Sequence, residues 1–333
     1  MNEDHRQMAH ALRLARRALG NAWPNPAVGC VLVRDGRVVG RGWTQPGGRP
    51  HAERMALDQA GALARGATAY VTLEPCAHHG RTPPCADALI AARVARVVTA
   101  LTDPDPRTAG QGHARLRAAG IPVTEGVMTP EAADQQRGFL LRVTEGRPMV
   151  TLKLATSLDG RIATASGESQ WITGPAARRH VHLMRLRHDA VMVGGATARA
   201  DRPALNVRGF GPVRQPVRVV VSGQSVLPDL PPEDDDHGPL WQVAGPMGQV
   251  LRDLGARGLT RIFCEGGGGL AGSLLSEGLV DVLLLYSAGL VLGAGGRAAV
   301  GALDFGPLAD APRFTLHRSY PVGPDLFQHW RRA

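Results

Sequence analysis

The first 125 residues alternate between apolar residues at helical spacing and short continuous apolar runs. Apolar positions recur on one helix face from Met8 to Leu19, and Gly20 follows as a stop signal. The dipeptide at 35–36, Asp-Gly, separates two apolar runs and is typical of a hairpin. The predicted helices cover 4–19, 86–92 and 112–119, and a further helix begins at 51. The predicted strands cover 28–33, 37–42, 69–73, 94–101 and 121–125. This alternation predicts a layered α/β domain.

A second alternating series follows a break near 142–148, where a helical pattern ends in Glu-Gly-Arg-Pro. Its predicted strands cover 149–155, 190–194, 217–221, 260–264 and 282–286, its predicted helices 178–187 and 270–277, and a Pro- and Asp-rich loop 227–238. No internal repeat links the two series. The sequence therefore predicts two α/β domains, at 1–145 and 146–333.

Composition narrows the class of protein. Of the 333 residues 44% are apolar and 20% charged, which is typical of a globular protein and too apolar for a disordered one. The longest apolar stretch, 280–292, contains Asp281 and is too short to cross a bilayer. The N-terminus has no apolar signal core and the chain has only four cysteines, so we expect a reducing cytoplasm and no membrane partner.

The net charge of +9 allows a nucleic-acid partner, but its distribution does not favour one. Lys153 is the only lysine among the 38 basic residues, and the arginines are scattered without a basic block. We interpret them as a solvated surface together with a pocket for a phosphorylated substrate.

Three short motifs in the first half suit a metal site. They are His51-Ala52-Glu53, Pro-Cys at Cys76 and Pro-Cys at Cys85, each placed where a loop meets a predicted helix. One imidazole and two thiolates suit Zn²⁺ and leave a fourth position for water. Glu53 lies too close to His51 along the chain to ligate beside it, and it is placed to shuttle protons instead. His-x-Glu followed by two such cysteines is the signature of zinc-dependent base deaminases.

Other residues near these motifs have alternative interpretations. His78 and His79 lie between the two cysteines and are rival ligands, although we expect them to border the substrate. Cys30 and Cys264 belong to no such motif, and we expect them in the core.

The N-terminal half resembles a known family. The run Asn-Pro-Ala-Val-Gly-Cys from Asn25, the His-Ala-Glu motif and the run Glu-Pro-Cys-Ala-His-His-Gly-Arg-Thr-Pro-Pro-Cys ending at Cys85 look like the bifunctional riboflavin-biosynthesis deaminase-reductases. Eight residues separate the cysteines, whereas nucleic-acid and cytidine deaminases usually carry Cys-x-x-Cys. The resemblance implies a cytidine-deaminase-like α/β/α domain in which His51, Cys76 and Cys85 hold zinc, Glu53 moves protons and Asn25 binds the pyrimidine. Many members carry histidine where this chain has Thr44.

A glycine-rich segment in the second half meets the pattern G-x-G-x-x-G at Gly267, Gly269 and Gly272. A glycine loop that opens a helix can donate N–H groups to a pyrophosphate. A Rossmann fold also requires an acid at the end of the next strand, and 286–288 offers none. We therefore exclude a Rossmann fold, and a tight helix–strand corner remains the alternative interpretation.

The second half resembles the reductase half of the same family, through Thr-Leu-Lys-Leu-Ala-Thr-Ser-Leu-Asp-Gly-Arg from Thr151, Ser-Gly-Glu-Ser-Gln-Trp-Ile-Thr from Ser166, and Gly-Gly-Ala-Thr from Gly194. That half is similar in fold to dihydrofolate reductase and uses NADPH. By resemblance the NADP contacts are Ala155, Trp171, Thr197, Asp201, Gly267, Gly268, Gly269, Leu270, Ala271, Gly272 and Ser273. By resemblance the contacts to the sugar-phosphate substrate are Ser169, Arg185, Leu205, Arg208 and Glu265.

Two positions in this half carry separate expectations. Lys153 stands on an otherwise apolar strand, and we hypothesise that its ammonium holds or protonates an oxygen of the opened ribose. Many members have Asp-Ser where this chain has Ser222-Gly223, so we expect that cofactor contact to be lost or to come from the backbone.

The expected function is a pair of consecutive steps in riboflavin biosynthesis. Zinc-dependent deamination of 2,5-diamino-6-(5-phosphoribosylamino)pyrimidin-4(3H)-one by 1–145 precedes NADPH-dependent reduction of the ribosyl side chain by 146–333, which gives 5-amino-6-(5-phosphoribitylamino)uracil. The alternatives are a nucleic-acid or nucleoside deaminase with an accessory domain, a structural zinc module, and a chain with only one active half. The resemblance also implies a homo-oligomer, a dimer or larger.

Overall fold

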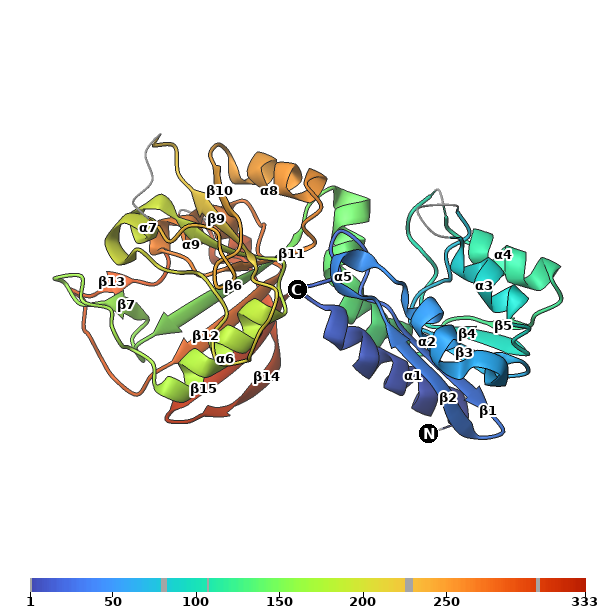
Figure 1. The fold of residues 1–333 in the computed structure, drawn as a ribbon. Helices are drawn as coiled ribbons and strands as arrows, with labels where there is room; N and C mark the ends of the chain where they lie inside the picture. Colours follow the sequence, from blue (N-terminus) through green and yellow to red (C-terminus); the bar gives the residue numbers. More distant parts are fainter. Residues whose placement is uncertain (1, 79–82, 107, 225–229, 304–305) are drawn as a thin grey trace. The chain divides into compact units, whose positions relative to one another are not determined.

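The computed structural model describes residues 2–78, 83–106, 108–224, 230–303 and 306–333. The chain divides into two compact units, Met1–Gly146 (unit 1) and Arg147–Ala333 (unit 2) (Figure 1). Among the described residues no helix is both long and apolar enough to cross a membrane.

Unit 1 is built on a five-stranded sheet with the order β2-β1-β3-β4-β5. The β1–β2 and β1–β3 pairs are antiparallel, whereas β3, β4 and β5 run parallel. The predicted hairpin is confirmed, because Asp35 and Gly36 take φ values of 49° and 72° between β1 and β2. The strands are β1 (Gly29–Arg34), β2 (Arg37–Trp43), β3 (Thr68–Val71), β4 (Arg96–Thr99) and β5 (Val123–Thr124).

Helices cover both faces of this sheet. Met8 and Leu12 of α1 pack with Ala132 of α5 on one face, and α2, α3 and α4 pack on the other through residues such as Ala56 and Leu89. The predicted α/β/α layering is therefore confirmed. The helices are α1 (Glu3–Ala15), α2 (Ala52–Ala60), α3 (Cys85–Ala91), α4 (Gln111–Ala118) and α5 (Thr129–Glu145). Short 3-10 turns cover Arg16–Ala18, Pro46–Gly48 and Gly61–Ala64, so the first helix ends earlier than the predicted 19.

Unit 2 contains an eight-stranded mixed sheet with the order β10-β9-β8-β11-β6-β12-β15-β14. The first six strands run parallel, and β15 and β14 add an antiparallel hairpin at one edge. The strands are β6 (Met149–Thr156), β8 (Ala190–Gly194), β9 (Val217–Val221), β10 (Leu240–Val243), β11 (Arg261–Cys264), β12 (Val282–Ser287), β14 (Phe314–Val322) and β15 (Asp325–Arg332). A separate two-stranded sheet joins β7 (Arg161–Ala163) to β13 (Arg297–Ala298).

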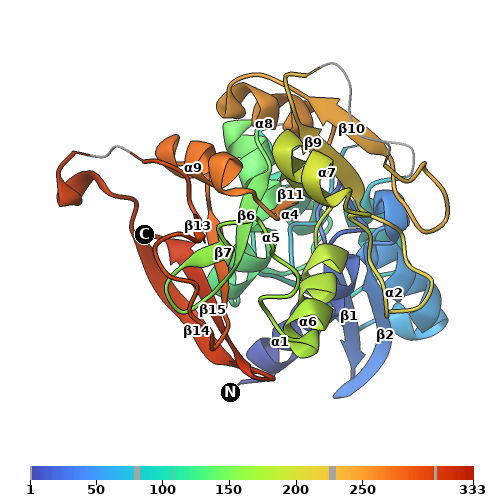
Figure 2. The ribbon, with the colours of Figure 1, turned by 90° about the vertical axis from the view of Figure 1, so that its left-hand side faces the viewer.

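Helices accompany this sheet, and Figure 2 shows them from a second side. Ala198 of α7 packs with Val191 of β8 and Val220 of β9. The helices are α6 (Pro175–Leu186), α7 (Gly195–Asp201), α8 (Met247–Ala256) and α9 (Gly268–Ser276), with a 3-10 turn at Leu308–Asp310. Not predicted from the sequence were α7, α8, β7, β10, β13 and the β14–β15 hairpin. Part of the predicted loop at 227–238 lies outside the described residues, and Asp234 and His237 of the remainder form an isolated bridge.

Unit 2 begins with a buried ion pair that offers a stability test. The Arg147 guanidinium donates to both oxygens of Asp281 at 2.8 and 2.9 Å, and the Val150 N–H donates to Asp281 Oδ2 at 2.8 Å. We expect Asp281→Asn to lower the free energy of unfolding of unit 2 by about 3–5 kcal/mol, because the buried guanidinium loses its counter-charge. Urea unfolding, followed by hydrogen exchange of unit 2 amides, measures this change.

The matched control for this prediction is Asp253→Asn on the exposed face of α8. We expect it to change the free energy of unfolding by less than about 0.5 kcal/mol. Equal effects of the two substitutions would show that the buried pair contributes no more than a surface contact.

Candidate active sites

The three predicted zinc ligands meet in unit 1. The donor atoms of His51, Cys76 and Cys85 all lie within 4.8 Å of one another. His51 Nδ1 lies 3.7 Å from Cys76 Sγ and 3.4 Å from Cys85 Sγ. Tetrahedral Zn²⁺ with its usual bond lengths separates a sulfur and a nitrogen ligand by about 3.6 Å. The donor set and its spacing therefore fit zinc, with one coordination position left for a water molecule.

Each ligand stands where a loop meets regular structure. His51 is the N-cap residue of α2, and Cys85 is the first residue of α3. Cys76 lies in the loop after β3, where its sulfur accepts the Cys85 N–H at 3.3 Å and its carbonyl accepts the Ala86 N–H at 3.1 Å. Hydrogen bonding with Cys85 and the neighbouring His51 imidazole lower the pKa of Cys76 to about 4. A thiolate, which is the form that binds metal, is therefore favoured at Cys76.

Glu53 lies beside this cluster in the first turn of α2 and is 4% exposed. Among the described residues it is not part of the metal-ligating group. Burial raises the pKa of Glu53 to about 7, and the negative charge on Cys76 adds to this effect. A carboxyl group poised in this way can take up and release a proton near neutral pH.

Asn25 and Thr44 lie in the loops that lead to the cluster. Gly48 has a φ of +85° and packs so tightly on Asn25 that a Cβ there would lie 1.7 Å from Asn25 Nδ2. Asn25 is thereby held against the loop that ends at His51. Thr44 is 2% exposed, and its hydroxyl accepts the Val28 N–H and donates to the Pro26 carbonyl, both at 3.0 Å. Its hydroxyl therefore fastens the loop after Asn25 to the end of β2.

The remaining cysteines and histidines of the sequence analysis are also placed. Cys30 and Cys264 are fully buried in strands, as predicted. His78 is exposed and is not part of the metal-ligating group among the described residues, and His79 lies outside them.

Glu74 is a functional candidate that the sequence analysis missed. Its carboxylate is buried two residues before Cys76 and accepts main-chain N–H groups from the 103–113 segment. No motif predicts this contact, because its partners are backbone groups about 30 to 40 residues further along the chain.

Lys153, Arg185 and Glu265 face one another in unit 2. Arg185 of α6 donates to Glu265 through Nε at 2.5 Å and Nη2 at 3.0 Å, and its Nη1 donates to the Asn206 carbonyl at 2.6 Å. Lys153 is half-buried in the middle of β6, and the loss of water lowers the pKa of its ammonium, against the opposing charge of Glu265. Arg185 is thus engaged by protein groups, and its predicted phosphate contact remains a proposal.

Two glycine-rich helix starts meet at the ends of the parallel strands. Gly267 is the N-cap residue of α9 with a φ of +43°, and a Cβ there would lie 2.7 Å from Thr197 Oγ1 of α7. A Cβ on Gly195 would lie 2.7 Å from Ser222 Oγ, so the Ser222 hydroxyl faces α7. The N–H groups of a first helical turn have no partner within the helix, and together with glycine residues they suit a dinucleotide phosphate. This cradle fits NADPH.

The other predicted contacts of unit 2 differ in exposure. Trp171 is 67% exposed, with the Arg178 guanidinium 4.6 Å from its ring centroid, and Asp201 is exposed at the end of α7. Arg208 is exposed, while Ala155 and Ser169 are half-buried. The Leu205 side chain is 2% exposed in an apolar cluster with Val191, so a substrate contact there has to come from its backbone.

His188 links α6 to β6 and predicts a pH effect. Its ring contacts the Met184 carbonyl at 2.6 Å and Thr151 Oγ1 at 2.9 Å, two residues before Lys153. Burial lowers the pKa of His188 from its ordinary 6.5 to about 3, so below pH 6.5 the unfolded chain binds a proton that the folded chain excludes.

We therefore expect the free energy of unfolding of unit 2 to fall between pH 6.5 and 4.5, with His188 contributing up to about 1.4 kcal/mol per pH unit. His188→Gln removes this contribution and flattens the slope, as urea unfolding at several pH values will measure. Identical slopes for the variant and the parent chain would contradict the assignment.

Known families match both units. The model of the RibD C-terminal domain matches 148–327, and that of the cytidine and deoxycytidylate deaminase zinc-binding region matches 1–101. The riboflavin biosynthesis protein RibD of Escherichia coli K12 is 44% identical, over 98% of this chain and 99% of that protein. The chain belongs to the RibD family.

Solved RibD structures share the whole fold. Acinetobacter baumannii RibD has a TM-score of 0.89 at 40% identity, covering 99% of each chain. A Thermotoga maritima protein, described as a diaminohydroxyphosphoribosylaminopyrimidine deaminase/5-amino-6-(5-phosphoribosylamino)uracil reductase, has a TM-score of 0.88 at 34% identity and the same coverage. The predicted two-domain architecture of deaminase-like and reductase domains is therefore confirmed.

Proposed function

We propose that this chain carries out both consecutive steps of the RibD family, deamination of 2,5-diamino-6-(5-phosphoribosylamino)pyrimidin-4(3H)-one and reduction of its ribosyl side chain with NADPH. The observation that carries the proposal is the cluster of His51, Cys76 and Cys85 with a buried, unligated Glu53 beside it. The match of unit 2 to the RibD C-terminal domain supports the second step.

In the deaminase unit, His51, Cys76 and Cys85 would hold zinc, which supplies the Lewis acidity that activates a water molecule. Glu53 takes the proton of that water and returns protons to the ring nitrogen and to the leaving ammonia. Its raised pKa allows both transfers near neutral pH. Asn25, held against the loop before His51, orients the pyrimidine by hydrogen bonding.

In the reductase unit, the start of α9 with Thr197 would bind NADPH, the hydride source. Arg185 fixes the Glu265 carboxylate next to Lys153. Lys153 then gives a proton to the ring oxygen of the ribose as its bond to C1′ breaks, so that the C1′=N carbon left by this opening can accept hydride. Exposed Arg208 is available for the substrate phosphate, which a guanidinium binds through paired hydrogen bonds.

The test uses the purified full-length chain with the diaminopyrimidine phosphate, with and without NADPH. We expect ammonia release in both reactions, and NADPH oxidation only after deamination has supplied its product. Ammonia release without NADPH oxidation, or neither, would contradict the proposal for one half or for both.

A nucleic-acid deaminase is the rival function, suggested by the charge of +9. Salt-sensitive RNA binding together with deamination of RNA would support this rival. The eight-residue cysteine spacing and the reductase unit both argue against it. A homo-oligomer and a cytoplasmic location stay predictions.

A further inference from the structure

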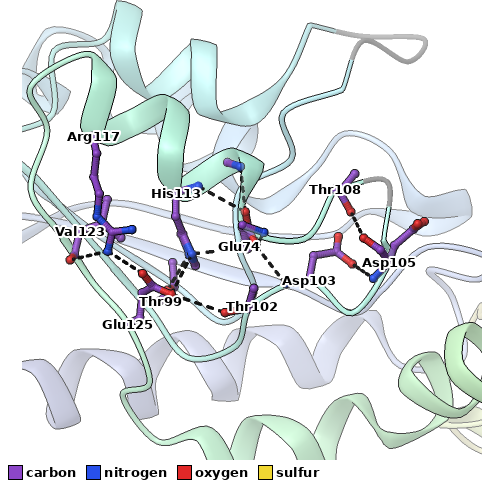
Figure 3. Close-up of polar contacts among 12 residues, drawn as sticks. Glu74, Thr99, Thr102, Asp103, Asp105, Thr108, His113, Arg117, Val123 and Glu125 are labelled. Carbon is purple, nitrogen blue, oxygen red and sulfur yellow. Dashed lines mark hydrogen bonds and ion pairs between the residues drawn. The ribbon is translucent and has the colours of Figure 1, made fainter.

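Glu74 is a buried carboxylate surrounded by backbone donors. Its side chain is 1% exposed. Oε1 accepts the N–H groups of Gly112 at 2.8 Å and His113 at 3.3 Å, and Oε2 accepts those of Gly110 at 2.9 Å and Asp103 at 3.1 Å (Figure 3). Four N–H donors around one carboxyl group match the acceptor capacity of an ionised carboxylate.

These bonds connect the loop of a zinc ligand to the start of α4. The Glu74 N–H donates to the Leu101 carbonyl at 2.8 Å, so both the main chain and the side chain of Glu74 are held. Gly112 also packs closely against Pro75, the residue after Glu74. A Cβ on Gly112 would lie 1.9 Å from the Pro75 carbonyl oxygen. The chain is therefore clamped at 74 and 75, immediately before Cys76.

Cys76 is held on its other side by α3, through the N–H groups of Cys85 and Ala86. The Cys76 backbone thus lies between two fixed points, the start of α3 and the Glu74 clamp. The position of Cys76 Sγ relative to His51 depends on both points.

A second layer supports the start of α4. The His113 ring is 2% exposed and lies 3.0 Å from both Thr99 Oγ1 and Glu125 Oε2, and Glu125 in turn accepts from Arg117 at 2.5 Å (Figure 3). His113, one of the four donors to Glu74, is therefore itself held beside β4 and the segment after β5. A rigid donor set can transmit its position to the carboxylate that it binds.

We propose that Glu74 is a positioning residue of the deaminase: its carboxylate sets the place of the Cys76 thiolate in the zinc site without touching metal or substrate. The inference rests on the proposed zinc-dependent function. In this proposal one buried side chain determines where one metal ligand lies.

Glu74→Gln tests the role. The amide keeps the size of the side chain but presents an NH₂ group to backbone donors, so part of the N–H set loses its acceptor. We expect the zinc dissociation constant of the full-length chain, measured by chelator competition, to rise about tenfold to hundredfold, as for other supporting residues around metal sites. We also expect altered d–d and thiolate bands in the Co²⁺-substituted chain, and faster amide exchange at Gly110 and Gly112.

Two controls separate positioning from general destabilisation. Asp4→Asn breaks the Arg96–Asp4 ion pair in the same unit. We expect the zinc affinity of this variant to stay within twofold of the parent. We expect its Co²⁺ spectrum to be unchanged. NADPH oxidation by unit 2 of the Glu74 variant, assayed with the deaminated substrate, should also stay within twofold of the parent. A parent chain that binds no zinc would contradict the proposed function itself.

Glu74→Asp keeps the charge and shortens the reach, so it decides the question if Glu74→Gln fails to fold. We expect the zinc affinity of Glu74→Asp to be weaker than that of the parent and stronger than that of Glu74→Gln. Its Co²⁺ spectrum should be shifted. A folded Glu74 variant with parental zinc affinity and an unchanged Co²⁺ spectrum would overturn the inference while leaving the proposed function intact.

Discussion

Glu53→Gln is expected to lower the deamination rate by about 10²–10⁴-fold while zinc stays bound. The physical reason is that glutamine preserves the shape of the buried site but cannot take up or release a proton. Because Glu53 lies outside the ligand group among the described residues, the metal should be retained. Ammonia release under saturating substrate and the zinc content of the purified variant measure the two effects.

The reductase activity of the same variant is the internal control for Glu53. Unit 2 has its own sheet and core, so we expect NADPH oxidation with the deaminated substrate to stay within twofold of the parent. Loss of zinc from Glu53→Gln would show that Glu53 is a ligand, and parental ammonia release would show that another group moves the proton.

Lys153→Met is expected to lower NADPH-dependent reduction by about 10²–10⁴-fold and to leave ammonia release within twofold of the parent. Methionine keeps the apolar length of the side chain but removes the only lysine ammonium of the chain, which faces Glu265 and Arg185. The rate of NADPH oxidation with the deaminated substrate measures the loss.

Lys153→Arg is the matched variant, because it keeps the positive charge in a larger and flatter group. We expect it to recover only part of the rate. Parental reduction by Lys153→Met would remove Lys153 from the mechanism, and parental reduction by Lys153→Arg would show that charge alone is required. Opposite effects of the Glu53 and Lys153 variants on the two reactions would establish that the two steps use separate sites.

Patterns within a few residues predicted much of this molecule. The hairpin at 35–36 follows from an Asp-Gly pair, and the start of α2 follows from the glycine- and proline-rich loop before His51. The six parallel strands of unit 2 include five predicted as short apolar runs, which is typical of strands buried on both faces. Spacing was informative here because the physical constraint, burial or turn formation, acts locally.

Several elements of unit 2 were missed, and α8 among them carries Val250, Leu251 and Leu254 at helical spacing. Residues of β14 are exposed over most of its length, and its apolar alternation, Phe314, Leu316, Tyr320 and Val322, is broken at Arg318. Its place in the sheet comes from pairing with β15, which is itself paired with β12. Pairing of this kind is tertiary, and a strand at a sheet edge needs only one partner to form.

Residue types and spacing predicted His51, Cys76 and Cys85 as ligands of the proposed zinc site, with His78 and His79 as rivals, because only a few side chains bind zinc and they must occur in a workable order. Only the tertiary structure decided how those ligands are held. Glu74 is bound by backbone groups at 103–113, Arg185 is paired with Glu265 some 80 residues away, and Leu205 is turned into the core. A backbone N–H is carried by every residue except proline, so its partners cannot be inferred from the letters of a sequence.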